Sequence, residues 1–233
     1  MRAGWTITGD HPMSGVIDTA YRVFAGPPPE SLYICTCCGL SAEQQVKLRS
    51  RPVRDYTRAD LDAWFSSAAA DPYPVAAWTH VLPRLLEALV FGAVHPLEPT
   101  QFLSRAPVAN TYWNASQQQV LDQILHWYLT VSDWPDGITL DDVVVLFERG
   151  GWDLDDLLAQ VLALPEARFL SVLTDRWLHP EAMRRAPRHS MTTFYQSKDL
   201  RARLFDIIQA HPAESAPCVR AIAICDALDQ HVN

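Results

Sequence analysis

Three closely spaced cysteines are the residues of this sequence best suited to hold a metal ion. Cys35-x-x-Cys38 has the spacing at which two thiolates hold one edge of a tetrahedral zinc site, and Cys37 lies between them. The remaining ligands would have to come from residues without paired metal-ligand spacing, namely His11, His80, Cys218 or Cys225. We therefore expect no bound cofactor. A zinc-binding protein or enzyme centred on Cys35, Cys37 and Cys38 stays as an alternative.

One short motif is similar to part of a zinc deaminase site. The segment His179–Glu181 has the His-x-Glu pattern in which the glutamate moves protons beside a metal-bound water. The paired cysteines of that site are missing, because Cys218 is followed three residues later by Ala221. The sequence also lacks a Gly-x-Ser-x-Gly nucleophile elbow, a glycine-rich phosphate loop and a His-Glu-x-x-His motif. These observations predict a non-catalytic protein, without catalytic residues.

An acidic stretch from Asp133 to Asp156 contains eight carboxylates and a single base, Arg149, within a chain of formal net charge −8. Several of the acids follow helix start signals, where the positive end of the helix dipole favours a carboxylate, so capping alone could place them. Alternatively, two helices that begin alike could project their carboxylates toward one region and speed the capture of a basic protein. We predict a protein-binding surface formed by Asp133, Asp136, Asp141, Asp142, Asp153, Asp155 and Asp156.

Two basic segments, Lys47–Arg58 and Arg184–Arg203, oppose this stretch. Phe194 and Tyr195 are interleaved in the second segment, and such a combination suits a nucleic-acid strand. The acidic total argues against that use, because nucleic-acid affinity depends on lysine and arginine neutralising phosphates. We therefore expect a solvated loop there and no nucleic-acid partner, with a nucleic-acid or regulatory adaptor as a further alternative.

Helix start and stop signals recur along the chain, whereas the alternating pattern of strands is almost absent. Start signals precede apolar residues at helical spacing at Ser14, Ser41, Thr57, Thr139 and Asp153. The apolar run from Val75 to about Val90 predicts a long helix that Pro83 should kink or divide. The polar stretch from His179 to about Gln196 is expected to be a loop.

The predicted fold is therefore all-α, an irregular stack of about ten helices in antiparallel hairpins. The stack is compatible with a HEAT-like arrangement, but the start signals follow no strict period. We expect residues 1–233 to form a single domain, with a sub-boundary near 132–138 because Trp134–Gly137 has the composition of a turn.

Between residues 32 and 131 the chain resembles a family of uncharacterised bacterial helical proteins. The shared features are a cysteine cluster, a helix start, a Leu-Pro-Arg-Leu-Leu-Glu helix and a Trp-containing, Gln-rich helix start. The matching positions are Cys35, Cys37 and Cys38, then Pro52–Leu61, then His80–Leu89, and Tyr112–Val120. The chain departs from the family pattern at Val53, Tyr56 and Val81. The resemblance implies a bacterial origin and helical architecture, and it assigns no activity.

Composition narrows the expected location and partner. No segment has the roughly 20 uninterrupted apolar residues of a membrane span. The N-terminus lacks the apolar run of a secretory signal, and five cysteines, an odd number, suggest reduced thiols. We therefore expect a cytoplasmic protein without a membrane partner. The leading hypothesis is a bacterial immunity protein that neutralises a basic toxin domain through its acidic surface.

Overall fold

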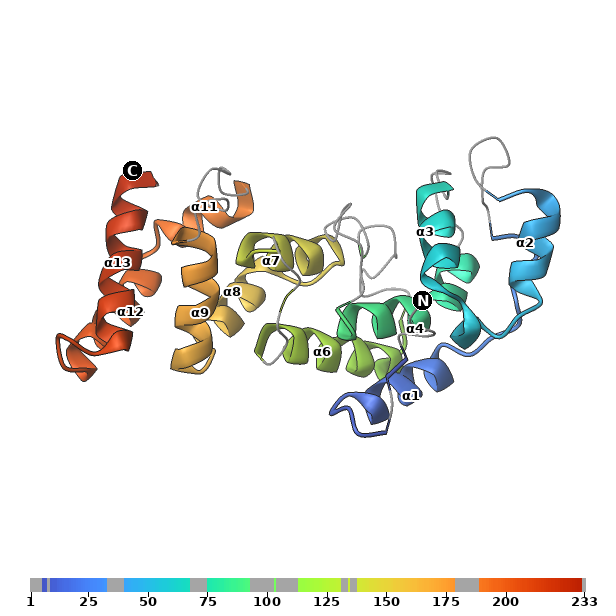
Figure 1. Ribbon diagram of the computed structural model, residues 1–233, viewed down its shortest axis with the longest axis horizontal. Coiled ribbons are helices and arrows are strands. Elements are labelled where there is room, and N and C mark those ends of the chain that lie inside the picture. The colour runs from blue at the N-terminus through green and yellow to red at the C-terminus, as the bar shows by residue number, and fades with distance from the viewer. Residues whose placement is uncertain are drawn as a thin grey trace. The chain divides into compact units, whose positions relative to one another are not determined.

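The computed structural model of the chain describes residues 6–7, 9–32, 40–67, 75–92, 103, 113–130, 134, 138–178 and 189–231. All regular elements in these ranges are helices (Figure 1), which confirms the predicted all-α fold. The chain divides into two compact units, Met1–His126 and Trp127–Asn233, here called the N-terminal and C-terminal units. The division falls inside a helix, α6 (Ala115–Thr130), and not at the turn near 132–138 that composition suggested.

The described part of the N-terminal unit contains, besides most of α6, four α-helices and one 3-10 turn: α1 (Ser14–Val23), α2 (Ala42–Arg49), η1 (Val53–Asp55), α3 (Arg58–Ser67) and α4 (Val75–Val90). Ser41 caps α2 in a reciprocal capping box with Gln44, as predicted. Thr57 and Asp60 exchange the same bonds at the start of α3. The predicted Ser14 cap is wrong, since Ser14 is the first helical residue and its N-cap, Met13, makes no side-chain cap bond.

Helix α4 forms the centre of the N-terminal unit. Every residue from Val81 to Val90 is buried, and α4 packs against α1 and η1. Of the two outcomes expected for Pro83, a kink or a division of the helix, the division does not occur, because α4 continues through Pro83 from Val75 to Val90. Trp64 of α3 meets Trp78 of α4 edge to face, with ring centroids 4.6 Å apart. Burial of the whole second half of α4 explains why its apolar residues surround the helix.

Among its described residues the C-terminal unit has six further helices: α7 (Leu140–Arg149), α8 (Leu154–Leu162), α9 (Glu166–Trp177), α11 (His189–Tyr195), α12 (Lys198–Ala210) and α13 (Ala216–His231). Two pairs of consecutive helices pack together, α7 with α8 and α12 with α13. The second pair also packs on earlier helices, through α12 with α8 and α13 with α9 (Figure 1). The stacked hairpins match the predicted arrangement. The loop predicted for 179–196 is partly wrong, because its last residues form α11.

A compact turn fixes the direction in which α8 leaves α7. Gly151 has a φ of 98°, a left-handed conformation that side-chain-bearing residues rarely adopt. Its N–H bonds to the Glu148 carbonyl, and the Trp152 N–H reaches back to the Phe147 carbonyl across 3.2 Å, which is the Schellman pattern. Trp152 also packs edge to face on Phe147. Two backbone hydrogen bonds and one ring contact therefore stabilise the turn between α7 and α8.

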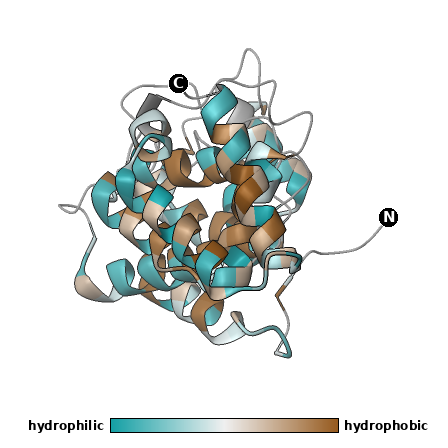
Figure 2. Cartoon of the chain, turned by 90° about the vertical axis from the view of Figure 1, so that its left-hand side faces the viewer, coloured by the Kyte–Doolittle hydropathy of each residue, from teal (hydrophilic) through white to brown (hydrophobic). Residues whose placement is uncertain are grey.

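Hydrophobic and hydrophilic residues are interspersed along the helices (Figure 2), as expected for helices that bury one face. Among the described helices, none is by itself long and apolar enough to cross a bilayer. Helices α8 and α9 meet the length and composition criterion only as a pair, and they are bent by 115° at their junction.

Candidate functional site

The seven acidic residues predicted to form one surface divide into three groups. Asp133 and Asp136 lie outside the described residues. Asp141 and Asp142 of α7 are only 3% and 8% exposed, so in this structure both side chains lie inside the fold. The three acids at the start of α8 are all exposed, and we call Asp153, Asp155 and Asp156 the α8 acidic turn.

Asp141 is the centre of a buried polar cluster that joins three helices. Its Oδ1 accepts a hydrogen bond of 3.0 Å from Arg176 Nε on α9 and one of 2.5 Å from the Tyr195 hydroxyl on α11. The guanidinium of Arg176 also lies over the ring of Trp177, 4.4 Å from its centroid. A buried carboxylate is tolerable only when it is paired and hydrogen-bonded, and both conditions hold here. The negative charge of Asp141 is therefore offset by Arg176 inside the fold.

The tyrosine of this cluster stays protonated over a wide pH range. Burial raises the pKa of Tyr195 well above its usual value of 10.0, and the neighbouring Asp141 charge raises it further. The phenol therefore acts as a hydrogen-bond donor to the carboxylate. Trp177 packs edge to face on Tyr195 with centroids 4.8 Å apart and closes the cluster on that side.

Asp142 has a local structural role. Its Oδ2 accepts bonds from the backbone N–H and the hydroxyl of Thr139, at 3.1 and 3.0 Å, and this completes the capping box of α7. A sequence signal for this burial exists: the run Val143–Phe147 is apolar on all sides of the helix, which is typical of a helix enclosed by others.

The α8 acidic turn presents its charge to solvent. Asp153 caps the helix by accepting a 3.1 Å bond from the Asp156 N–H, while Asp155 and Asp156 occupy the first turn. Leu157 and Val161 are buried and anchor the opposite face of α8. Residues 127–233 contain 16 acidic and 10 basic residues, so the C-terminal unit carries −6 of the total formal charge of −8. The exposed turn is thus part of the more acidic unit.

The N-terminal unit contains a second buried cluster of the same composition, an arginine, a carboxylate and a tyrosine. Arg84 and Glu87 of α4 form an ion pair of 2.6 Å with both side chains at most 3% exposed. The Tyr21 hydroxyl of α1 donates to Glu87 across 2.6 Å, and the Ile7 N–H donates to its other oxygen across 2.8 Å. Arg84 Nε also donates to the Tyr56 carbonyl across 2.9 Å. These bonds tie α1, η1 and the N-terminal segment to α4.

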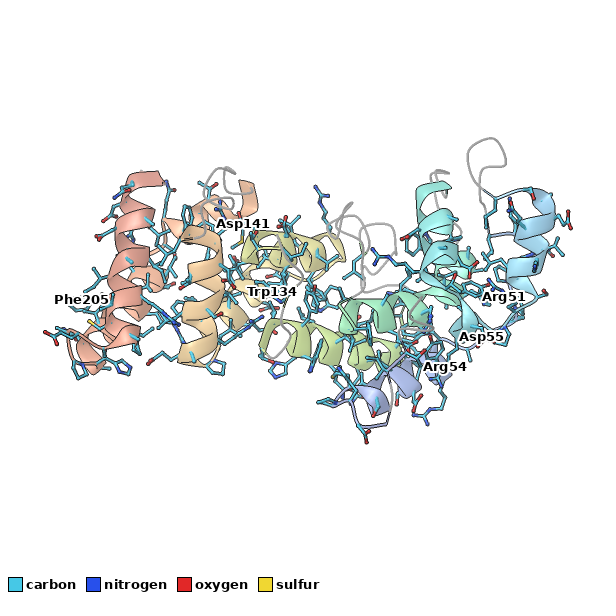
Figure 3. All side chains as sticks on the ribbon, viewed as in Figure 1. Arg51, Arg54, Asp55, Trp134, Asp141 and Phe205 are labelled. Carbon is cyan, nitrogen blue, oxygen red and sulfur yellow. The ribbon has the colours of Figure 1, made fainter. Side chains whose placement is uncertain are left out.

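Several residues of this second cluster lie in the Pro52–Leu61 and His80–Leu89 segments. Arg84 and Glu87 belong to the second of these segments, and Tyr56 belongs to the first. Arg54, in the same segment, forms a 2.5 Å ion pair with Asp18 and lies over the Tyr21 ring (Figure 3 labels Arg54). These motif residues therefore hold elements together.

The predicted zinc ligands are only partly described. Cys35, Cys37 and Cys38 lie outside the described residues, whose His, Cys, Asp and Glu side chains form no group of three placed to hold a metal. His80 Nε2 lies 3.3 Å from the Tyr56 hydroxyl, and burial lowers the pKa of His80. Burial also raises the pKa of Tyr56 to about 12. His11 Nδ1 accepts a bond from the Met13 N–H.

The remaining thiol candidates lie in the C-terminal unit. Cys218 is buried and Cys225 is partly buried, and both belong to α13. Burial raises the pKa of Cys225, which keeps its thiol protonated and weakens it as a metal ligand. Neither thiol was part of a predicted spaced pair. The Cys218 sulfur lies against α12, 3.9 Å from the Ile208 carbonyl, whereas Cys225 contacts α12 through its backbone carbonyl, which accepts from Arg201.

The arginines of the first basic segment are bound within the N-terminal unit. Arg51 pairs with Asp60 at 2.7 Å, Arg58 lies 3.7 Å from Asp62, and Arg49 donates to the carbonyls of Pro29 and Glu30. Figure 3 labels Arg51 and Arg54 near η1. Their charges are therefore offset locally. In the second basic segment, Arg184, Arg185 and Arg188 lie outside the described residues.

No family model, no curated protein and no solved structure matches the chain.

Proposed function

We propose that this chain is a non-catalytic helical protein-binding module, and specifically an immunity protein of a bacterial cytoplasm that neutralises a basic toxin domain. The observation that carries the proposal is the α8 acidic turn, where three exposed carboxylates stand together on a helix whose opposite face is anchored by Leu157 and Val161. Because this helix is packed in place, its backbone does not have to be ordered when a partner binds, and binding therefore costs less entropy.

The charge distribution supports the same proposal. Asp141 is neutralised by Arg176 inside the C-terminal unit, whereas the α8 acidic turn remains open to solvent within a unit of formal charge −6. A concentrated exposed charge steers an oppositely charged protein and raises its association rate, most strongly at low salt. A basic toxin domain is the partner that this arrangement favours.

The direct test is co-expression with the products of the genes next to its own in the native genome. We expect one of these products to inhibit growth alone, to be harmless together with the chain, and to co-purify with it. The double variant Asp155→Asn/Asp156→Asn should slow association of the two proteins about tenfold at low salt, and less at high salt.

The matched control removes two exposed acids elsewhere. Asp10 and Glu43 lie in the N-terminal unit, and Glu43, like Asp155, stands in the first turn of a helix. Asp10→Asn/Glu43→Gln therefore removes the same charge and should leave association nearly unchanged. Equal slowing by both double variants would reject the α8 acidic turn as the binding surface. The lack of any neighbouring product that both inhibits growth and binds would reject the immunity function.

A further inference from the structure

The α12–α13 hairpin carries three large apolar side chains that are open to solvent. Phe205 of α12 is 56% exposed, and Val219 and Ile222 of α13 are 53% and 42% exposed. Isolated apolar residues are common on protein surfaces, but a group on one helix pair marks a contact surface more often. The question is therefore whether the three side chains lie together.

On α12, the residues that contact α13 place Phe205 beside the seam between the two helices. Arg201 bonds to Asp229 and to the Cys225 carbonyl, and the Ile208 carbonyl lies 3.9 Å from the Cys218 sulfur. Phe205 is four residues after Arg201 and three before Ile208, so all three share one stripe of the helix.

On α13, the same reasoning applies to Ile222. It is four residues after Cys218 and three before Cys225, the two residues that contact α12. Val219 precedes Ile222 by three residues and lies on the adjoining part of the same face. Because α12 and α13 run antiparallel, Phe205 and Ile222 flank the middle of the seam from opposite sides.

These side chains lie on the solvent side of the hairpin. The core side is formed by the buried residues Leu204, Ile207, Ala221 and Ile224, where the hairpin packs on α8 and α9. Phe205 lies on the side of the pair turned away from α9 (Figure 3). We call Phe205, Val219 and Ile222 the outer seam.

The charges around the outer seam are mostly negative. Apart from the Arg201–Asp229 ion pair, exposed acids of the hairpin and its turn outnumber exposed bases: Asp199, Asp206, Glu214 and Asp226 against Lys198 and Arg220. Asp226 follows Ile222 by one helical turn, and Asp206 adjoins Phe205. Two further arginines have partners within the unit: Arg201 pairs with the exposed Asp229, and Arg203 donates to the carbonyls of Leu162 and Leu164.

We propose that the outer seam docks an amphipathic helix of a partner protein, with an apolar stripe flanked by lysine or arginine. A helix fits because the C-terminal unit already packs helix pairs on helix pairs, and a partner helix would continue that stack. The acidic surround favours a basic partner and opposes a second copy of this chain, whose acids would meet these acids. The inference concerns a surface other than the α8 acidic turn and does not rest on the proposed function.

The probe is a fluorescent amphipathic peptide of about 16 residues, with leucine at helical spacing and lysine at the remaining positions. A second peptide carries glutamate in place of every lysine. By fluorescence anisotropy with the full chain, we expect the lysine peptide to bind about tenfold more tightly than the glutamate peptide. The double variant Phe205→Ser/Ile222→Ser should weaken binding of the lysine peptide about tenfold while leaving the charge unchanged.

Two further variants make the result specific. Val46→Ser/Phe91→Ser removes exposed apolar side chains of the N-terminal unit, which are 56% and 50% exposed, and should leave binding unchanged. Asp206→Lys/Asp226→Lys should weaken the lysine peptide and strengthen the glutamate peptide. The proposal is overturned if the lysine peptide does not bind, or if Phe205→Ser/Ile222→Ser binds it like the parent chain. A dimer of the chain that Phe205→Ser dissociates, seen by sedimentation, would overturn it in favour of a second copy.

Discussion

Arg176 Nε lies 3.0 Å from Asp141 Oδ1, and neither side chain is more than 5% exposed, so an ion pair connects α9 to α7 inside the C-terminal unit. Arg84 and Glu87 form the corresponding pair inside the N-terminal unit, 2.6 Å apart. In both units a tyrosine hydroxyl donates a hydrogen bond to the carboxylate, Tyr195 to Asp141 and Tyr21 to Glu87. Each unit thus encloses one positive and one negative charge together, and the stability of each should depend on keeping both.

Removing one partner of the first pair should be strongly destabilising. Asp141→Asn leaves the Arg176 guanidinium buried without its counter-charge, and such changes cost about 3 to 5 kcal/mol. Urea unfolding followed by circular dichroism measures the loss. Asp155→Asn is the matched control, because it removes an equivalent first-turn carboxylate that is exposed. Similar losses for both variants would contradict the structural role assigned to Asp141.

Removing both partners of the second pair should cost less than removing one. Glu87→Leu alone leaves Arg84 and the Tyr21 hydroxyl without their acceptor, whereas Arg84→Met/Glu87→Leu replaces the pair by apolar groups of similar size. We expect a coupling free energy of about 1 to 3 kcal/mol in a double-mutant cycle measured by urea unfolding. Additive losses would show that the two side chains act independently.

The buried tyrosines should make the fold sensitive to alkaline pH. The pKa of Tyr195 in the folded chain is raised above its unfolded value of 10.0, so above that pH the unfolded chain releases a proton that the folded chain retains. Stability is therefore complete below pH 10 and declines above it, by about 1.4 kcal/mol per pH unit for one full proton. Tyr195→Phe should reduce this slope in unfolding measured between pH 9 and about 11. An unchanged slope would contradict the assignment.

The cysteine cluster leads to a prediction of the zinc content of the protein, which elemental analysis measures. We expect protein purified without chelator to contain far less than one zinc per chain, because only two ligands of a tetrahedral site have the required spacing. Cys35→Ser should leave the metal content unchanged. One zinc per chain in the parent protein, lost in Cys35→Ser, would establish the alternative of a zinc site at Cys35, Cys37 and Cys38.

Local sequence chemistry was sufficient for much of the fold. The start signals at Ser41, Thr57, Thr139 and Asp153 lead to helices because each cap depends only on bonds within three residues. The Ser14 signal failed since its hydroxyl bonds to the Gly9 carbonyl, outside the helix. Helix α11 was missed within a segment whose polar composition resembles that of a loop, although Met191, Phe194 and Tyr195 of this helix are buried.

The candidate surface was less accessible to sequence reasoning, as Asp141 and Asp155 illustrate. Both are the second residue of a helix, each after a leucine and before another aspartate. The local pattern is the same, but the outcome is decided by residues 35 and 54 positions away from Asp141, namely Arg176 and Tyr195. Packing of distant helices over α7 encloses Asp141, whereas α8 leaves Asp155 in solvent. The shared Leu-Asp-Asp start does not contain that information, and the local difference is the apolar run Val143–Phe147 that follows it in α7.

Gly151 gives the glycine turn between α7 and α8 a meaning beyond chain reversal. The left-handed conformation of this residue sets the direction of the helix that follows. It therefore also sets the direction in which three negatively charged side chains point, the first of them only two residues later. Alanine at this position would leave the number of charges unchanged but would strain the turn that holds them in place. The orientation of the α8 acidic turn thus depends on a residue that has neither charge nor side chain.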